Sequence, residues 1–322
     1  MSVAGARIGV ISNPASGHNR DHFPAVQAAM AGCSGLVLHA VTDSASDIPQ
    51  ALRELASSGA DTLIINGGDG TVSAVIGRLL EGNTFAQTPL IAVLPAGTAN
   101  MTAGDVGVRG RLQAAVKRVC RWAAQPAAAQ QTCERRERRL LRLDMDGAVH
   151  HGMFLGSGAI ISGTDYAHRE IHARGLRDDA SLALTTLRTV WGLLRNDPAF
   201  TATTPVSLSI DGAPTEEHDA LILALSTLHR LSFGMRPFWG HGDGALRLTL
   251  VDRDCRHFLP NFVNIIRGRP GRGACPGNGY HSVNADALCM HMAGAINLDG
   301  EVLTPAGPLR ITPSAPVTFL RL

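Results

Sequence analysis

The sequence predicts a two-domain protein, an N-terminal α/β domain with a parallel sheet followed by a mainly antiparallel β domain, with the boundary between residues 135 and 136. The first observation is the length of 322 residues, which exceeds one typical domain. The second is that residues 7–100 alternate short apolar segments with helical patterns, whereas most later segments alternate apolar with polar residues. A hydrophobic fraction of 45% with 17% charged residues indicates a substantial core.

The first domain is expected to contain four buried parallel strands, at RIGVIS (7–12), GLVLHAV (35–41), DTLIIN (61–66) and PLIAVLP (89–95). Their apolar residues are continuous, as in a sheet covered on both faces. Residues 44–60 combine capping residues, an early proline and an apolar stripe, which predicts a helix. A second helix is predicted from the helical spacing of Val72, Val75, Ile76, Leu79 and Leu80, with Gly82 at its end. Right-handed crossovers then bring the loops after the strands to one edge of the sheet.

The pattern of residues changes beyond the basic run ERRERR (134–139), which we interpret as a solvated face or a linker. Residues 140–154 resemble two strands around an Asp146-Gly147 hairpin turn. Further strands are predicted at 206–212, 219–226, 244–251 and 315–322, and helices at 179–195 and 257–267. The last strand can return to the first domain.

Composition excludes several classes of function. A net charge of +2 gives no argument for a nucleic-acid partner. Only Lys117 among the 29 basic residues is lysine, so phosphate groups would be bound by arginine, backbone amides or a metal ion. The 6 cysteines form no C-x-x-C pair, which argues against a zinc site or a disulfide framework. The N-terminus lacks a secretory apolar core and no apolar run reaches about 18 residues, so a cytoplasmic protein is expected that can still contact a membrane surface.

Glycine-rich loops follow three of the predicted strands, at NPASG (13–17), GGDGT (67–71) and LPAGTAN (94–100). They fall at the edge where α/β folds bind ligands, and helix N-termini there favour anions. The sequence therefore predicts a nucleotide site. No loop carries the lysine of a P-loop, and no acid follows GGDG at the distance that a dinucleotide-binding fold requires.

Two acidic positions suggest a cation near that nucleotide. Asp69 in GGDGT is tolerable beside phosphates if a divalent cation lies near it; the alternative is that it caps the helix beginning at Thr71. Asp243 in HGDGALRLTL (241–250) is placed in a tight turn whose carbonyls could share a magnesium ion. By itself, such an Asp-Gly turn is most often only a turn.

Asp299 and Glu301 flank Gly300 in INLDGEVL (296–303). A hydroxyl that accepts a phosphoryl group needs a base or an orienting group, which either carboxylate could supply. The alternative is a solvated hairpin turn.

Taken in order, NPASG, GGDGT, LPAGTAN, GDGALRL and LDGE resemble the bacterial diacylglycerol kinase catalytic-domain family, which includes sphingosine and ceramide kinases and has NAD kinase as a distant relative. The resemblance implies a nucleotide-binding domain, a β-rich lipid domain, ATP and Mg²⁺ as cofactors, and a lipid substrate. It implies ATP binding by Asn13, Pro14, Ala15, Ser16, Gly17, Thr42, Gly67, Gly68, Asp69, Gly70, Thr71, Val72, Ser73 and Thr98. It also implies a magnesium site at Asp243 with the backbone oxygens of Gly240 and Ala245, and Glu301 as general base beside Asp299. Relatives often carry aspartate where this chain has Met101.

The predicted function is therefore ATP- and Mg²⁺-dependent phosphorylation of a hydroxyl of diacylglycerol, a sphingoid base or ceramide. The alternatives are a soluble small-molecule or NAD kinase and a non-catalytic nucleotide-binding regulator. A lipid substrate implies a peripheral membrane surface, for which residues 261–273 with Arg267, Arg269 and Arg272, or residues 181–195, are candidates. Either segment could instead only pack on the β domain. Relatives are often homodimers.

Overall fold

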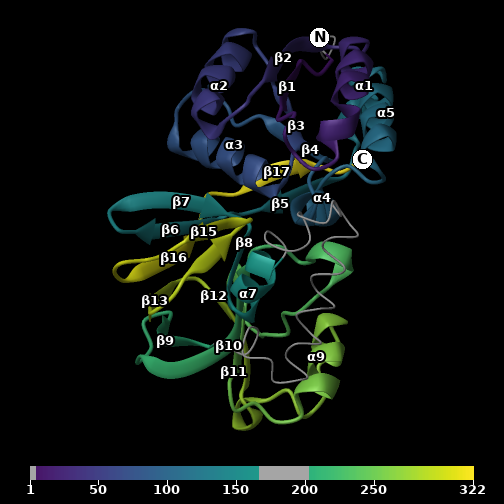
Figure 1. Ribbon diagram of the computed structural model, residues 1–322. Coiled ribbons are helices and arrows are strands. Elements are labelled where there is room, and N and C mark those ends of the chain that lie inside the picture. Colours follow the sequence, from purple (N-terminus) through teal and green to yellow (C-terminus); the bar gives the residue numbers. More distant parts are fainter. Residues whose placement is uncertain (1–4, 167–202) are drawn as a thin grey trace. The chain divides into compact units, whose positions relative to one another are not determined.

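The computed structural model describes residues 5–166 and 203–322 (Figure 1). The chain divides into two compact units. Unit 1 consists of Met1–Arg138 together with Ala315–Leu322, and unit 2 consists of Arg139–Ser314. Residues 179–195 lie outside the described residues, so the helix predicted there is not compared with the structure.

Unit 1 contains a six-stranded sheet with the strand order β2-β1-β3-β4-β17-β5. All strands are parallel except β5, which pairs antiparallel with β17. Its strands are β1 (Ile8–Ser12), β2 (Leu36–Val41), β3 (Thr62–Gly67), β4 (Leu90–Pro95), β5 (Arg135–Arg138) and β17 (Val317–Leu320). Its helices are α1 (Asn19–Ala31), η1 (Ala45–Asp47), α2 (Ile48–Ser57), α3 (Asp69–Glu81), α4 (Met101–Val106), α5 (Leu112–Ala123) and α6 (Ala127–Gln131). Helices α1 and α5 contact each other on one face of the sheet, and α2 and α3 contact each other on the opposite face (Figure 1).

Continuous apolar runs explain why this sheet is covered twice. Every residue of β1 and β3 is buried, so side chains on both faces need a covering layer. Ile8, Val10 and Ile64 pack with residues of α1 and α5. On the opposite face, α2 buries Leu52 and Leu55. The predicted parallel α/β domain is therefore confirmed.

The basic run ERRERR forms a strand, and the interpretation as a linker is wrong. Residues Arg135–Arg138 are β5, which pairs antiparallel with β17 at the edge of the sheet. Its exposed and half-buried residues alternate, as they do in a strand with one covered face. The side chain of Arg138 is 12% exposed and pairs with Asp105, of which 1% is exposed, at 2.8 Å. Arg138 thus faces inward to a buried carboxylate, and Arg136 donates to the backbone carbonyl oxygen of the same Asp105.

Unit 2 is built on an 11-stranded antiparallel sheet. Its strands are β6 (Leu141–Met145), β7 (Ala148–Gly152), β8 (Phe154–Gly158), β9 (Thr204–Ile210), β10 (Glu216–Ser226), β11 (Leu246–Asp252), β12 (Tyr280–Ala285), β13 (Leu288–Met292), β14 (Ile296–Leu298), β15 (Glu301–Leu303) and β16 (Leu309–Pro313). The helical elements are α7 (Ala159–Tyr166), η4 (Ser232–Gly234), α9 (Phe258–Ile266) and η5 (Pro276–Asn278). The predicted antiparallel domain is confirmed, and α9 matches the helix predicted at 257–267.

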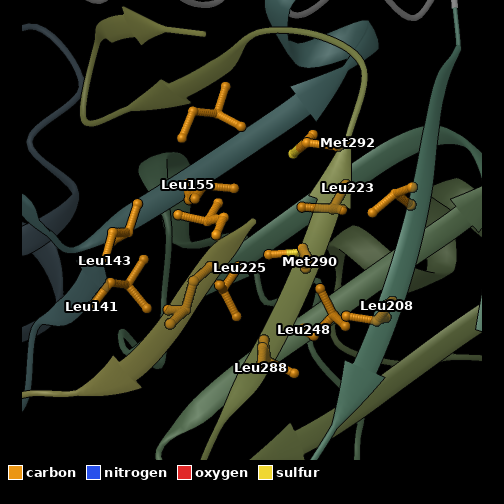
Figure 2. Close-up of a cluster of buried hydrophobic side chains, with 14 of the residues drawn as sticks. Leu141, Leu143, Leu155, Leu208, Leu223, Leu225, Leu248, Leu288, Met290 and Met292 are labelled. Atoms are coloured by element: carbon orange, nitrogen blue, oxygen red, sulfur yellow. The ribbon is translucent and has the colours of Figure 1, made fainter. Parts of the chain in front are cut away.

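One apolar cluster holds unit 2 together (Figure 2). Strand β6 shows how the sequence produces it, because Leu141 and Leu143 are fully buried while Arg142 between them is half-buried. Leu155, Leu223 and Leu225 add to the same cluster from β8 and β10. Each fully buried leucine contributes about 1.5–3 kcal/mol from the apolar surface removed from water. Period-2 alternation is thus the pattern that packs this sheet.

Candidate functional site

The predicted nucleotide loops follow strands whose carboxyl ends are aligned. In the ladder of unit 1, Ser12 pairs with Asn66 and Gly67 pairs with Pro95, so β1, β3 and β4 end at one level. Thr42 follows β2 at the same level, and its backbone N–H donates to the carbonyl oxygen of Ser12 at 2.9 Å. The structure therefore brings residues 13–17, Thr42, 67–73 and 94–100 to one edge of the sheet, as predicted.

Side-chain hydrogen bonds join the three loops into one surface. Asn13 Nδ2 donates to Thr71 Oγ1 at 3.1 Å, which links the first loop to the second. The N–H of Gly68 donates to Ser16 Oγ at 3.1 Å, which forms a second link between them. His18 Nδ1 lies 2.7 Å from the carbonyl oxygen of Gly97, which ties the first loop to the third. Phosphate-binding amides on these loops would thus be held in fixed positions before a ligand arrives.

The second and third loops approach so closely that only glycine fits between them. A Cβ atom added to Gly97 would lie 2.5 Å from Cα of Gly68. Gly97 is fixed further by Asn100, whose side chain accepts from its N–H at 2.8 Å and donates to its carbonyl oxygen at 2.7 Å. Asn100 itself has φ of 48°, a left-handed conformation that asparagine tolerates better than most residues. The glycines of GGDGT and LPAGTAN therefore serve a backbone-to-backbone contact as well as any ligand.

The N-terminus of α3 supplies amide donors at this edge. The helix begins at Asp69, and the N–H of Val72 donates to the carbonyl oxygen of Gly68 at 3.0 Å. The N–H groups of Asp69, Gly70 and Thr71 therefore precede the first intrahelical hydrogen bond and point out of the helix end. With the helix dipole they form a favourable environment for an anion such as a phosphate.

Asp69 has a structural role that the sequence did not indicate. Its Oδ1 accepts from the N–H of Thr102 at 2.8 Å and its Oδ2 accepts from the N–H of Met101 at 3.0 Å. The carboxylate, buried to 7% exposure, thus caps α4, and the alternative that it caps its own helix is not what the structure shows. Each oxygen retains a second lone pair, so the cation-linked role remains a prediction.

The residues predicted to bind ATP differ in accessibility. Partly or fully exposed are Asn13, Pro14, Ala15, Ser16, Gly17, Gly68, Gly70, Thr71 and Thr98. Buried are Thr42, Gly67, Asp69, Val72 and Ser73. The buried ones support the loops from below, so the exposed ones are the candidates for direct contact with a nucleotide.

A buried polar network below the loops was not predicted. Asn19 Nδ2 donates to the carbonyl oxygens of Asn13 at 2.8 Å and Asn66 at 3.1 Å. Asn66 Nδ2 donates to Ser12 Oγ at 2.9 Å, and the same hydroxyl lies 2.8 Å from His39 Nε2. Burial lowers the pKa of His39. Two polar residues near the carboxyl ends of largely apolar strands, Ser12 and Asn66, are the sequence signal that could have revealed it.

The predicted base lies in a hairpin turn of unit 2. Leu298 pairs with Glu301, and the two residues between them, Asp299 and Gly300, have φ of 49° and 100°. Positive φ at both central residues is the geometry that favours Asp-Gly in two-residue hairpins. The carboxylate of Asp299 accepts from the N–H groups of Met153 at 2.7 Å and Phe154 at 3.0 Å, whereas Glu301 is exposed. Asp299 therefore fixes the turn against β8, and Glu301 is left accessible for chemistry.

The turn around Asp243 offers oxygen donors. Asp243 is exposed, and the neighbouring carbonyl oxygens of Gly240 and Gly242 accept from Asn284 Nδ2 at 3.1 and 2.9 Å. Asn284 Oδ1 is one of the buried oxygens without a hydrogen-bond partner in the described part of the chain. Carboxylate, carbonyl and amide oxygens are the donors that Mg²⁺ prefers, so this turn, with Ala245 at its end, fits the predicted site.

The candidate residues belong to different units. The nucleotide loops and Asp69 lie in unit 1, whereas Asp243, Asp299 and Glu301 lie in unit 2. A single site that combines both sets stays a prediction. Of the helices in the described residues, none has both the length and the apolar character needed to cross a bilayer.

Residues 7–131 match the family model for the diacylglycerol kinase catalytic domain. The resemblance to that family is confirmed by this match. Of the curated relatives, "Probable lipid kinase YegS-like" of Enterobacter sp. (strain 638) is 33% identical over 85 residues, which cover 26% of this chain and 28% of that protein. "Probable lipid kinase YegS" of Shigella flexneri is 34% identical over 106 residues, which cover 32% of this chain and 34% of that protein. The chain thus matches only about a third of the length of these relatives.

Similarity to solved structures extends over nearly the whole chain. A crystal structure of a diacylglycerol kinase from Bacillus anthracis str. Sterne has a TM-score of 0.62 and 18% identity, covering 98% of this chain and 97% of that one. Yeast NADH kinase complexed with NADH has a TM-score of 0.51 and 11% identity, covering 99% of this chain and 84% of that one. At these identities the similarity establishes the fold.

Proposed function

We propose that this chain, whose residues 7–131 match the diacylglycerol kinase catalytic domain, is a lipid kinase that transfers the γ-phosphoryl group of ATP to a lipid hydroxyl. The observation that carries the proposal is the convergence of NPASG, GGDGT and LPAGTAN at the carboxyl edge of one parallel sheet, within the matched residues. Backbone amides and a helix N-terminus at such an edge suit a polyphosphate.

In the proposed reaction, the exposed loop residues bind and orient the phosphates of ATP. Glu301 accepts the proton of the lipid hydroxyl as its oxygen forms a bond to the γ-phosphorus. The bond between that phosphorus and the β–γ bridging oxygen breaks, and the electron pair leaves with ADP. Positioning and electrostatic stabilisation supply most of the rate acceleration, because little covalent chemistry is left to the protein.

Asp243, with the carbonyl oxygens of Gly240 and Ala245, would hold Mg²⁺. When bound, Mg²⁺ offsets the negative charge of phosphate groups and of nearby carboxylates. The turn itself contributes fixed carbonyl oxygens, because Asn284 holds Gly240 and Gly242 from the side of β12. Asp69 supports the phosphate loops through its cap on α4, and Asp299 supports the position of Glu301.

A lipid acceptor requires contact with a bilayer, and α9 with the following loop supports this. Ile265 is buried against the sheet, whereas Leu259 on the same helix is 44% exposed. Arg267, Arg269 and Arg272, directly after the helix, are exposed. Apolar and cationic groups together favour an anionic membrane surface. We therefore propose a cytoplasmic enzyme that binds the inner membrane face reversibly.

A single assay tests the proposed activity. The protein is incubated with γ-³²P-labelled ATP and MgCl₂ in three separate reactions. The first contains vesicles that carry diacylglycerol, a sphingoid base and ceramide, the second contains NAD, and the third contains no acceptor. Label in the organic phase of the vesicle reaction supports a lipid kinase, and the chromatographic position of the product identifies the acceptor.

The other outcomes contradict the proposal in distinguishable ways. Label in NADP points to a soluble NAD kinase, and no transfer despite ATP binding points to a nucleotide-binding regulator. Co-sedimentation with anionic vesicles, compared with a variant in which Arg267, Arg269 and Arg272 are all glutamine, separately tests the membrane surface. Equal sedimentation of the two proteins would exclude this surface without deciding the activity.

A further inference from the structure

Two histidines and an aspartate from three adjacent strands of unit 2 meet at one point. Asp252 Oδ1 lies 3.1 Å from His218 Nδ1, and Asp252 Oδ2 lies 2.8 Å from His281 Nε2. The two imidazole rings are 4.8 Å apart between centroids. One ligand atom from each of the three residues lies within 4.8 Å of the other two. Among the described residues, no other set of three or more histidine, cysteine, aspartate or glutamate side chains comes together in this way.

Strand pairing explains why these residues share a face of the sheet. Ala220 pairs with Asp252 between β10 and β11, and Leu250 pairs with His281 between β11 and β12. Because side chains alternate along a strand, His218, two residues from Ala220, and Asp252, two residues from Leu250, point to the same side as His281. The fold itself therefore assembles the group, and no loop has to close to form it.

From this arrangement we propose that His218, Asp252 and His281 bind a divalent transition metal ion, with zinc as the best match. Two imidazole nitrogens and one carboxylate oxygen form a ligand set used by zinc and by iron(II), whereas Mg²⁺ prefers oxygen ligands alone. The group differs in ligand chemistry from the oxygen-lined turn at Asp243. Three protein ligands leave a fourth position for water.

The distances are compatible with one ion. Ligand atoms about 2.1 Å from a tetrahedral ion lie roughly 3.4 Å apart. The contacts at 3.1 and 2.8 Å involve the two different oxygens of Asp252, and one ligand atom from each residue lies within 4.8 Å of the others, so binding through a single oxygen requires side-chain shifts of about an ångström. The surroundings limit competition from bulk water, because the side chains of His218, Asp252 and His281 are 9%, 17% and 28% exposed. The site is thus largely enclosed, with access from the side of His281.

A neighbouring carboxylate is placed to orient one ligand. A metal on Nδ1 of His218 requires the ring proton to be on Nε2, and Nε2 lies 3.7 Å from Glu216 Oε2. Carboxylates that face the second nitrogen of a metal-bound histidine fix its tautomer and raise its basicity. Glu216 is therefore a positioning residue in this proposal, with its side chain 76% exposed.

The absence of a C-x-x-C pair argued against a zinc site, but this group contains no cysteine, and its three residues come from strands that are distant in the sequence. The competing interpretation is a hydrogen-bonded histidine–aspartate–histidine group without metal, in which Asp252 accepts a hydrogen bond from each ring. The two interpretations differ in a direct measurement, since only the first predicts saturable metal binding by the folded chain.

The test uses the full chain, freed of metal with a chelator and dialysed. Calorimetric titration with ZnCl₂ is expected to give one ion per chain at micromolar affinity or better. CoCl₂ is expected to give visible absorption bands of a four- or five-coordinate ion that ZnCl₂ removes, and excess MgCl₂ is expected to displace neither. Zinc should also raise the thermal unfolding midpoint, because it binds the folded chain.

Variants and matched controls separate this site from adventitious binding. His281→Gln and Asp252→Asn should each weaken zinc binding by at least about a hundredfold. Loss of a residue that only hydrogen-bonds to a metal ligand costs less, about 10- to 100-fold. His291→Gln on β13 and Asp254→Asn, both exposed, should leave it unchanged. Absence of saturable binding by the unmodified chain, or equal binding by the ligand and control variants, overturns the proposal. Whether the unmodified chain binds zinc saturably can be measured even if a ligand variant does not fold.

Discussion

Oδ1 of Asp69 accepts a hydrogen bond from the backbone N–H of Thr102 at 2.8 Å, which connects the first turn of α3 to the first turn of α4. The second oxygen accepts from Met101 at 3.0 Å, so one carboxylate satisfies two donors at the start of α4. The capping contact uses the backbone N–H of Met101, so it does not depend on the side chain at that position. Asp69 therefore links the glycine-rich turn of GGDGT to the loop LPAGTAN whatever ligand they bind.

The capping contact predicts that Asp69 affects stability as well as catalysis. Asp69→Ala should lower the free energy of unfolding by about 1–3 kcal/mol, because two buried N–H groups lose their acceptor. Asp69→Asn keeps one oxygen acceptor and should cost less. Urea unfolding followed by circular dichroism measures both changes, and Asp21→Asn, an exposed acid in the first turn of α1, is the control.

The same pair of variants tests the cation-linked role. If Asp69 acts only as a cap, kinase turnover should fall in proportion to the loss of folded protein in both variants. If it also acts near the cation and phosphates, Asp69→Asn should lose turnover by orders of magnitude while it remains folded at the assay temperature.

Because the second and third loops are in close contact, replacing Gly97 by alanine should have a different effect on stability than replacing Gly104. Gly97→Ala places a Cβ atom 2.5 Å from Cα of Gly68, so the loops must separate. We expect a loss of about 1–3 kcal/mol in stability and weaker ATP binding. Gly104→Ala, in α4, meets no atom within 4 Å and should stabilise by about 0.5–1 kcal/mol. Calorimetric ATP titration and urea unfolding of both variants check this, and unchanged ATP affinity in Gly97→Ala would contradict the placement of the nucleotide.

The fold was predictable from the sequence because its periodicities are unambiguous. Continuous apolar runs in β1 and β3 predicted the parallel sheet, and the alternation of Leu141 and Leu143 in β6 predicted the antiparallel one. The run ERRERR was misread because charge conceals the same alternation. Arg136 and Arg138 face inward to the Asp105 backbone and carboxylate, contacts that require β17 from the opposite end of the chain. No local pattern contains that partner.

The loops of the candidate site were predictable for a similar reason, since glycine clusters after strands are local signals. The supporting contacts were not. Asp69 as a cap for α4, Asn19 below the loops and the group around Asp252 each depend on residues from separate elements. Sequence reasoning finds residues that a motif places side by side, and it misses those that strand register brings together.

Breaking the buried ion pair between Arg138 of β5 and Asp105 should lower the free energy of unfolding. Arg138→Ala leaves the carboxylate of Asp105, of which 1% is exposed, without its 2.8 Å partner. Removing one member of a buried pair costs about 3 kcal/mol or more, because the other charge stays buried. The exposed Arg135, on the opposite face of the same strand, should change stability by less than about 0.5 kcal/mol when replaced by alanine. Equal effects in urea unfolding would show that Arg138 is solvated in solution.

The network below the loops predicts a pH dependence of stability. Burial lowers the pKa of His39 in the folded state, so the unfolded chain binds a proton more readily. The stability that neutral His39 contributes is complete above its ordinary pKa of about 6.5, and it is lost as pH falls towards the folded value. The slope cannot exceed about 1.4 kcal/mol per pH unit for one group.

His39→Gln keeps a hydrogen-bonding side chain beside Ser12 but does not titrate. Unfolding free energies of both proteins between pH 8 and pH 5 should therefore diverge below about pH 6.5, with the unmodified protein losing more. The difference between the two curves removes the contribution of other titrating groups. Parallel curves would mean that His39 is protonated equally in the folded and unfolded states.

Glu301 is the residue on which the proposed chemistry depends most. It begins β15 and is exposed, whereas Asp299 is bound to β8, so Glu301→Gln should leave the unfolding free energy within about 0.5 kcal/mol. Because glutamine cannot accept the proton of the lipid hydroxyl, turnover should fall by about two to four orders of magnitude. ATP affinity should not change.

Glu217→Gln, an exposed glutamate on β10, is the matched control and should keep full turnover. Asp299→Asn should instead destabilise unit 2, because the amide can no longer accept from the N–H groups of both Met153 and Phe154. A pre-steady-state measurement with γ-³²P-labelled ATP separates the phosphoryl-transfer step from lipid binding and product release. If Glu301→Gln transfers the label at the unmodified rate, Glu301 is not the base, and the acceptor proton must leave by another route.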